Sequence, residues 1–394
     1  MERHITARRT AALAGVAMLA SAFVLTACGT AGGGGGGGGG DGMLQELGEP
    51  EGAVSILAWP GYVEDGSNDP NVDWVSDFES NTGCEVTVKT FGTSDEALNL
   101  MKSGEYDVVS ASGDASLRLV AAGDVAPVNV DLLENYDGIF DFLKNQSWNS
   151  VDGQEYGIPH GYGANLLMYN TDVFPGGLDS WSAVFDDAGE HSGAVTAYDS
   201  PIYIADAAVY LMATQPDLGI ENPYALDETQ LAAAVELLKA QRQHIGEYWS
   251  DYLKEIQAFE TGDSVVGTTW QVIQNSITTG NTEVVLPKEG TTGWSDTWMI
   301  SSQSEHPNCA YAWLDWIASP ETNATATGYF GEAPSSAAAC DFRDDCEAYH
   351  AGDEEYASQI WYWSTPIPEC LDGRTDVECT DYAAWTAAWQ EIKG

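Results

Sequence analysis

Basic residues are scarce in this chain of 394 residues. Only 14 Lys and Arg stand against 61 Asp and Glu, which gives a formal net charge of −47. A field of this sign repels nucleic acid and anionic lipid surfaces, so we expect no nucleic-acid partner. A cationic ligand is attracted, although a solvated surface suited to a saline medium explains most of the charge equally well. The charge therefore gives only weak support to a cationic ligand.

The motifs of common enzyme and metal sites are also missing. The sequence has no G-x-S-x-G, Walker loop, Rossmann fingerprint or H-E-x-x-H. It has no C-x-x-C either, and its six histidines are scattered. We therefore predict a protein that is not an enzyme and that has no metal site and no cofactor. A carboxylate pair of the glycoside hydrolase type stays open as an alternative, because nothing in so acidic a chain selects one pair or excludes it.

No segment has the length of a transmembrane helix, but the N-terminus has the pattern of an export signal. Arg3, Arg8 and Arg9 precede an apolar run over 11–24, and "LTAC" ends at Cys28. This ending resembles the lipobox of bacterial lipoproteins, with an ordinary secretory signal as the alternative. We predict a lipoprotein signal peptide over 1–28, a lipid anchor on Cys28 at the outer face of the cell membrane, and a glycine-rich tether over 29–52. The export route, twin-arginine or general, stays open.

Six cysteines follow Cys28, an even number that suits disulfides in an oxidising compartment. Cys340 with Cys346 and Cys370 with Cys379 would close short loops, which leaves Cys84 and Cys309 as a third pair. The sequence alone permits 15 connectivities.

The chain is long enough for two lobes, and 44% hydrophobic residues are enough for sizeable cores. Residues 53–112 alternate strand and helix, the order that builds a parallel sheet. Ser94 is the expected N-cap of the second of these helices, and Asp227 with Gln230 predicts the start of a later one. A second αβ stretch follows residue 170. The last helix carries Tyr382, Trp385 and Trp389 on one face, which we interpret as a packing stripe.

Loops that follow predicted strands repeatedly hold an aromatic residue, an acid or both: "AWPGY", "SASGD", "AYDSP", "TTWQ" and "GWSD". In the last of these, Trp294 and Asp296 are two residues apart, so in an extended segment they point to the same side. A carboxylate binds an ammonium group, and an indole face attracts the same cation. Several such residues in one cleft fit a flexible diamine or polyamine.

The order of the segments "ILAWPGYV", "DFESNTGCEV", "YDVVSAS", "YGIPHGYGAN", "VVLPKEGTTGWSDTWMI" and "SPETNATATGYFGEAPSSAA" resembles the spermidine/putrescine-binding proteins of bacterial ABC transporters. The resemblance implies an α/β periplasmic-binding-protein-like fold of type II, with two lobes, two hinge crossings and the ligand in the cleft between the lobes. Residues 53–165 plus 300–394 would form lobe one, and 166–299 lobe two. The resemblance also implies a monomeric receptor that captures a polyamine and delivers it to an ABC transporter permease.

The family's binding residues carry over to this sequence unevenly. The positions that match are Trp59, Tyr62, Ser112, Asp199, Trp270, Trp294 and Asp296. A second family acid is Ile202 here, and a family tyrosine is Asp114. The tyrosine near the second hinge matches Tyr329 only ambiguously, and Glu332 lies close by as a further acid. We therefore predict Asp114 and Glu332 as additional ligand contacts. Trp361 and Trp363 would either cap the cleft or pack in the core.

Because of these departures, the ligand class has alternatives. The protein could instead bind another amine, an opine, another amino acid derivative or a sugar. Outside the transport class, a secreted glycoside hydrolase and a purely structural surface lipoprotein are the competing hypotheses.

Overall fold

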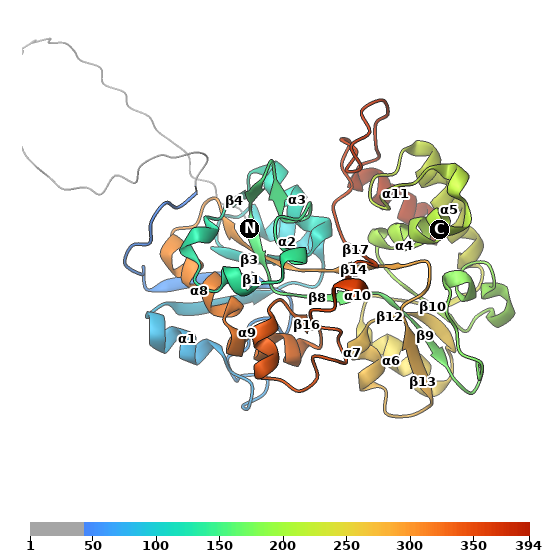
Figure 1. The fold of residues 1–394 in the computed structure, drawn as a ribbon, viewed down its shortest axis with the longest axis horizontal. Helices are drawn as coiled ribbons and strands as arrows, with labels where there is room; N and C mark the ends of the chain where they lie inside the picture. The colour runs from blue at the N-terminus through green and yellow to red at the C-terminus, as the bar shows by residue number, and fades with distance from the viewer. Residues whose placement is uncertain (1–42) are drawn as a thin grey trace, which may run out of the picture. The chain divides into compact units, whose positions relative to one another are not determined.

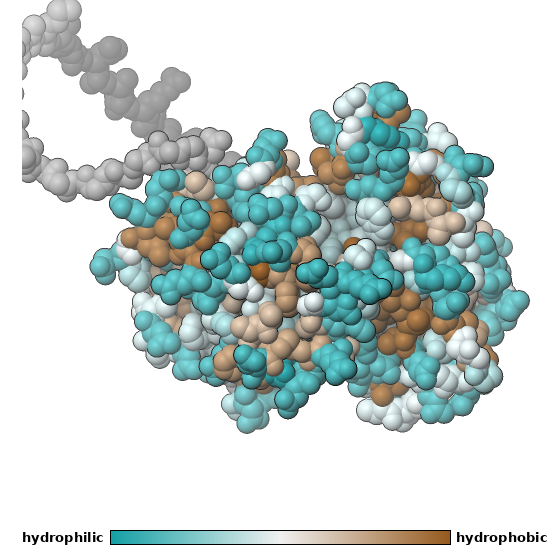
Figure 2. Space-filling model, viewed as in Figure 1, coloured by the Kyte–Doolittle hydropathy of each residue, from teal (hydrophilic) through white to brown (hydrophobic). Residues whose placement is uncertain are grey.

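The computed structural model describes residues 43–394. The predicted signal peptide, Cys28 and most of the tether lie outside the described residues. No helix within residues 43–394 is long and apolar enough to cross a membrane. Hydrophilic residues are spread over the face seen in Figure 2, with apolar residues in smaller patches between them, as the excess of acids leads one to expect.

The first lobe is built on a six-stranded sheet (Figure 1). Its strands are β2 (Glu85–Thr90), β1 (Ala53–Ala58), β3 (Val108–Ala111), β15 (Thr297–Ser301) and β4 (Val125–Ala126) in that order, with β7 (Gly157–Pro159) also paired to β15. Strands β1, β2 and β3 are parallel, whereas β15 runs antiparallel to β3. The predicted strand and helix alternation over 53–112 is thus confirmed.

Five helices belong to this lobe: α1 (Val75–Thr82), α2 (Ser94–Met101), α3 (Gly113–Ala122), α8 (Pro307–Ala318) and α9 (Pro320–Phe330). Helix α1 ends at Gly83, which has a left-handed φ of 74° that favours glycine. The N-cap of α2 is Thr93, whose side chain accepts a hydrogen bond from the Glu96 amide, so the prediction of Ser94 was wrong by one residue. This shift frees the Ser94 hydroxyl for another partner.

The second lobe contains a five-stranded sheet. Its strands follow the order β11 (Ile245–Trp249), β10 (Val195–Tyr198), β12 (Val266–Thr269), β9 (Leu166–Asn170) and β13 (Thr282–Val285). Its helices are α4 (Ile204–Thr214), α5 (Glu228–Arg242), α6 (Tyr252–Thr261) and α7 (Gln271–Ser276). Helix α5 begins with the predicted capping box of Asp227 and Gln230. Helix α4 is apolar around most of its circumference, as a helix buried on several sides requires.

A third sheet joins the lobes, with the strand order β16 (Ala333–Pro334), β8 (Gly161–Ala164), β14 (Thr291–Trp294) and β17 (Ile360–Tyr362). The chain passes from the first sheet to the second through β8 and returns through β14, which gives the pair of crossings that we expected. It passes to the second lobe again after β17. The remaining short elements are α10 (Glu354–Ala357) and the hairpin of β5 (Ser150–Val151) with β6 (Gln154–Glu155).

The C-terminal helix α11 (Tyr382–Lys393) packs against α5, and both lie together in Figure 1. Trp385 and Trp389 are buried in the core of the second lobe, so the predicted packing stripe is confirmed. Their location differs from the expectation that all of 300–394 belongs to lobe one. The apolar face of α11 packs against α5. The chain brings α11 to the second lobe through its third passage between the lobes, the one after β17.

Three disulfides join Cys84 to Cys309, Cys340 to Cys346 and Cys370 to Cys379. This is the pairing that the spacing favoured. The first bond links the chain before β2 to α8, the second starts within η8 (Ala337–Asp341) and closes a short loop after it, and the third closes a short loop before α11.

Candidate functional site

Tyr62 and Asp296 meet where the lobes join, although 234 residues separate them in sequence. The Tyr62 hydroxyl donates to Asp296 Oδ2 over 2.9 Å. Asp296 is only 4% exposed, and its Oδ1 has no hydrogen-bond partner among the described residues. Burial raises the pKa of Asp296 to about 6, while hydrogen bonds from Ser112 and Tyr62 act against the shift. Two predicted site residues, Tyr62 and Ser112, therefore contact the carboxyl group of a third, Asp296, which lacks a cationic partner among the described residues.

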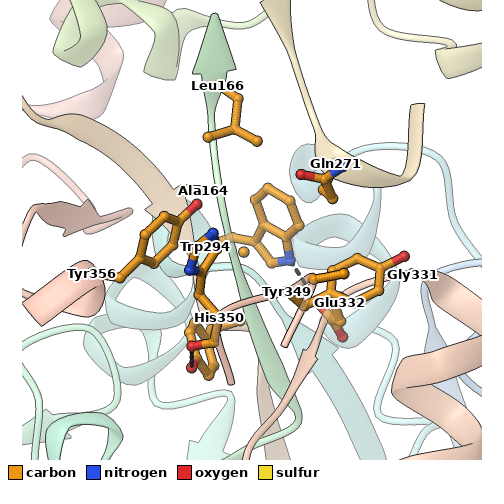
Figure 3. Close-up of a pocket in the computed structure, with 12 residues that line it drawn as sticks. Ala164, Leu166, Gln271, Trp294, Gly331, Glu332, Tyr349, His350 and Tyr356 are labelled. Carbon is orange, nitrogen blue, oxygen red and sulfur yellow. Dashed lines mark hydrogen bonds between the residues drawn. The ribbon is translucent and has the colours of Figure 1, made fainter. Parts of the chain in front are cut away.

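Trp294 and Glu332 form a second contact of the same site. The Trp294 indole N–H donates to Glu332 Oε2 over 2.6 Å, as the dashed line in Figure 3 shows. Glu332 is buried, and its Oε1 has no hydrogen-bond partner among the described residues. Burial and the charge of Asp296 raise the pKa of Glu332 well above its usual value. Asp296 and Glu332 are thus neighbouring buried acids.

His160 does not neutralise this pair. Its Nε2 lies 3.6 Å from Glu332 Oε1, a separation that would suit an ion pair. Burial lowers the pKa of His160 to about 3, however, so the imidazole is neutral at ordinary pH. Within residues 43–394, no Lys or Arg forms an ion pair with Asp296 or Glu332. Arg343 donates to the Glu332 main-chain carbonyl over 2.9 Å, and its charge acts on the Glu332 carboxyl only from there. A buried carboxylate without a direct ion-pair partner is costly, and a bound cation would supply one.

Asp114 lies in the first turn of α3 and is held by other residues of the protein. It accepts hydrogen bonds from the Ser94 hydroxyl over 2.8 Å and from the Tyr382 hydroxyl over 3.1 Å. Burial raises the pKa of Asp114, and its charge in turn raises the pKa of Asp296. Asp114 is therefore close enough to act on the acid pair electrostatically, while its own oxygens hold the C-terminal helix.

Asp199 is paired with residues other than those around Asp296 and Glu332. It forms an ion pair with Lys393 of α11 and accepts a hydrogen bond from the Trp389 indole over 3.2 Å. The structure does not bring this carboxylate to Asp296. The predicted contact of Asp199 with ligand would therefore require an ammonium group to share or replace the Lys393 partner.

The remaining predicted residues are aromatic. Trp270 lies 5.2 Å from Trp294 between ring centroids, and its indole N–H donates to Asn165 Oδ1 over 2.9 Å. Trp59 is half-buried and packs on Phe91 at 4.4 Å, away from this pair. Trp270 therefore belongs to the group around Trp294, whereas no ring contact or hydrogen bond among the described residues joins Trp59 to that group.

Sequence reasoning missed Asp206 in the first turn of α4. Its side chain is 2% exposed, and burial raises its pKa to about 7 against hydrogen bonds from Thr292 and Asn165. Its Oδ2 has no hydrogen-bond partner among the described residues. One signal was available: Asp206 is the only charged residue in the helix sequence "IADAAVYLMAT".

Gly163 allows the Trp294 ring to lie directly on strand β8. A Cβ atom at this position would lie 2.2 Å from Trp294 Cζ2, far inside van der Waals contact. We expect Gly163→Ala to displace the indole and to weaken ligand binding roughly tenfold or more, since a ring that is moved loses both its cation-π contact and its hold on Glu332. Calorimetric titration measures this loss. Gly176→Ala is the control, because its Cβ would meet no atom within 4 Å, and equal affinities of the two variants would contradict the prediction.

The arrangement can bind an organic cation, with acids for its charge and indole faces for its carbon chain. Within the described part of the chain, no group of three or more His, Cys, Asp or Glu side chains is placed to hold a metal ion.

Known proteins resemble this chain along most of its length. The model of the bacterial extracellular solute-binding protein family matches residues 73–351, more than half of the chain. The putrescine-binding periplasmic protein SpuD of Pseudomonas aeruginosa is 25% identical over 359 residues, which cover 86% of this chain and 91% of that protein. The putrescine/cadaverine-binding protein of the same species is 24% identical over 310 residues, which cover 73% and 80%.

Solved structures show the fold. The Tp0655 (TpPotD) lipoprotein of Treponema pallidum matches with a TM-score of 0.69 at 17% identity and covers 86% of this chain and 99% of that one. The spermidine/putrescine ABC transporter substrate-binding protein PotD from Streptococcus pneumoniae matches with a TM-score of 0.65 at 19% identity, covering 86% and 97%. The predicted two-lobed α/β fold is thus confirmed.

Proposed function

Because the chain belongs to the family of bacterial extracellular solute-binding proteins, we propose that its solute is a polyamine or a related alkyl amine. The observation that carries this proposal is the pair of buried acids, Asp296 and Glu332, each with an oxygen that has no partner among the described residues. An ammonium group supplies both the charge and the N–H donors that these oxygens lack. The Trp294 and Trp270 rings next to the pair suit the methylene chain of such a ligand.

The two-lobed fold explains how ligand binding can change the conformation of the protein. Tyr62 and Ser112 come from the first lobe and Trp270 from the second, so a ligand held by all three favours the closed arrangement of the lobes. We propose that a membrane permease of an ABC transporter recognises the closed form and accepts the amine from it. The relatives named above bind putrescine according to their names, which supports this ligand class.

The cellular setting follows from the sequence before residue 43. We propose that the protein is exported and held at the outer face of the membrane by lipid on Cys28, and that it works as a monomer. Mass spectrometry of the protein from a bacterial host tests the anchor, since a lipidated N-terminal cysteine adds the mass of its acyl chains. A mature chain that begins elsewhere would contradict it.

A thermal unfolding panel tests the ligand class. We expect putrescine, spermidine or spermine to raise the midpoint, because a ligand of the folded state adds RT ln(1 + [L]/Kd) to its stability, about 2.7 kcal/mol at a hundredfold excess over Kd. GABA tests an amino acid, glycine betaine tests a quaternary ammonium compound, and a neutral sugar is the negative control. The shift should persist at high salt, since contacts in a closed cleft are screened less than surface charge. A shift with the sugar alone would contradict the proposal.

A further inference from the structure

The hydroxyl group of Tyr62 lies beside both buried acids, Asp296 and Glu332, and has one proton to donate. It donates that proton to Asp296 Oδ2 over 2.9 Å. A hydroxyl that donates to one acid can only accept a hydrogen bond from a second one. Asp296 also receives a hydrogen bond from Ser112. The donors around the pair therefore favour the ionised form of Asp296 and a protonated carboxyl group at Glu332.

The charges around Glu332 favour the same assignment. Glu332 is 1% exposed, and burial together with the charge of Asp296 raises its pKa well above the usual value. The Arg343 guanidinium donates to the Glu332 main-chain carbonyl and forms its ion pair with Asp345. Tyr349 also faces Glu332, and its own pKa is raised, so this phenol is neutral. Since two neighbouring buried carboxylates repel each other, the ligand-free pair holds one proton.

His160 cannot accept this proton, because its neighbours fix its tautomer. The Trp298 indole N–H donates to His160 Nδ1 over 3.1 Å. An indole nitrogen is only a donor, so Nδ1 is the acceptor and the neutral ring carries its hydrogen on Nε2. Nε2 lies 3.6 Å from Glu332 Oε1. A second proton would have to sit on Nδ1 and break the bond to Trp298, and burial lowers the pKa of His160 to about 3 as well.

A small cavity beside Glu332 offers the proton a route to solvent. The cavity has about 20 Å³ of space for water centres, which is enough for one molecule. Its lining includes Glu332, Trp294, Tyr356 and His350 (Figure 3). The side chain of His350 is 47% exposed. The cavity therefore extends from the buried acid to a residue at the surface.

We propose that an ammonium group of the ligand binds between Asp296 and Glu332 in exchange for the proton of Glu332, which passes to the solvent. This inference rests on the proposed function as an amine receptor. The O–H bond of Glu332 breaks, and the resulting carboxylate accepts a hydrogen bond from the ammonium group. The buried site keeps the same net charge in both states, since the ligand adds one positive charge and the proton removes one. The Trp294 and His160 N–H groups stay as neutral donors to the new carboxylate.

Calorimetric titration with putrescine at pH 7, in buffers of different ionisation enthalpy, measures the protons released. We expect the parent chain to release about one proton per putrescine, because Glu332 is protonated before binding and ionised after it. Glu332→Gln should bind more weakly and release almost none, since its amide has no proton to exchange. Glu347→Gln is the matched control, because it makes the same substitution at an exposed position. Its proton release should equal that of the parent chain.

The affinity for putrescine should also depend on pH. Release of one proton raises the affinity roughly tenfold per pH unit, and we expect this rise between pH 6 and pH 7. The ligand does not cause it, since alkyl ammonium groups titrate only at about pH 10. Glu332→Gln should lose most of the rise, and Glu347→Gln should keep it. Infrared difference spectra of the parent chain provide a second readout, because putrescine should remove the band of a protonated carboxyl group.

The outcomes separate the proton exchange from the proposed function. If the parent chain binds no amine, the proposed function fails and the exchange with it. If the parent chain binds putrescine and releases no proton, the exchange alone is overturned. Equal release by the parent chain and by Glu332→Gln would overturn it too. Thermal unfolding without ligand shows whether Glu332→Gln folds. If it does not, the infrared spectra decide: loss of the carboxyl band supports the exchange, and an unchanged band overturns it.

Discussion

We expect the double substitution Asp296→Asn and Glu332→Gln to weaken amine binding by about 100-fold or more, because each acid offers an ammonium group a charge-assisted hydrogen bond worth about 1.5–3 kcal/mol. Calorimetric titration with putrescine measures the loss. The matched control is Glu134→Gln with Asp137→Asn, which removes the same formal charge from two exposed positions of the first lobe. Equal affinities of the two double variants would contradict the assignment of the acid pair.

The same double substitution should stabilise the ligand-free protein. Asp296 is buried, and a pKa of about 6 instead of 3.8 means that its ionised form is disfavoured in the folded state. At one pKa unit per 1.36 kcal/mol, neutral Asn at this position removes a cost on the order of 3 kcal/mol at pH 8. A variant that loses ligand while its free energy of unfolding rises would show that the acids are kept for binding. A fall in stability by several kcal/mol would contradict this.

We expect the ligand-free protein to be less stable at pH 8.5 than at pH 5. Burial raises the pKa of Asp206 to about 7 and that of Asp296 to about 6, whereas both carboxyls titrate near 3.8 in the unfolded chain. Between these values the folded state binds more protons than the unfolded state, so stability falls as the pH rises. Between pH 5 and pH 8.5 the shifts correspond to losses on the order of 3 kcal/mol for Asp206 and 1 kcal/mol for Asp296.

Denaturant unfolding at several pH values measures this slope. Repulsion among the many surface acids also lowers stability as the pH rises. Variants are therefore needed to show which part of the slope comes from the buried acids. Asp206→Asn should flatten it, while Asp217→Asn, at an exposed position, should leave it unchanged. Identical slopes in the parent chain and in Asp206→Asn would contradict the assignment.

Local patterns in the sequence predicted several secondary-structure elements of the fold. The alternation of strands and helices over 53–112 and the capping box of Asp227 with Gln230 both depend on neighbouring residues, and both are found in the structure. The Ser94 prediction failed by one residue because Thr93 and Ser94 are both good N-cap residues, and tertiary contact decides between them. In the structure, the Ser94 hydroxyl is needed by Asp114.

The sequence could not show which segments that are far apart in the chain pack together. Asp114 contacts Tyr382 across 268 positions, and Asp199 contacts Lys393 across 194. Both contacts exist only because α11 packs on the second lobe, which no local pattern of residues 382–393 indicates. Asp206 was missed for a related reason: an acid in a helix is ordinarily solvated, and only the packing around α4 shows that this one is buried.

The adjacency of Trp294 and Asp296 was the strongest signal in the sequence for the site. In the structure both side chains are buried, at 5% and 4% exposure, and each contacts a residue far away in sequence. The partners, Tyr62 and Glu332, were predicted as site residues for separate reasons. What links these four is the joining sheet, where β14 brings residues 291–294 beside β8.

Calorimetric titration of the purified protein with putrescine, at low and at high salt, tests the central claim most directly. We predict saturable binding of one amine per chain, with an affinity that falls only modestly between the two salt concentrations, because the buried acids are screened far less than the surface. The absence of saturable binding by putrescine, spermidine and spermine would contradict the account, and so would binding that high salt abolishes.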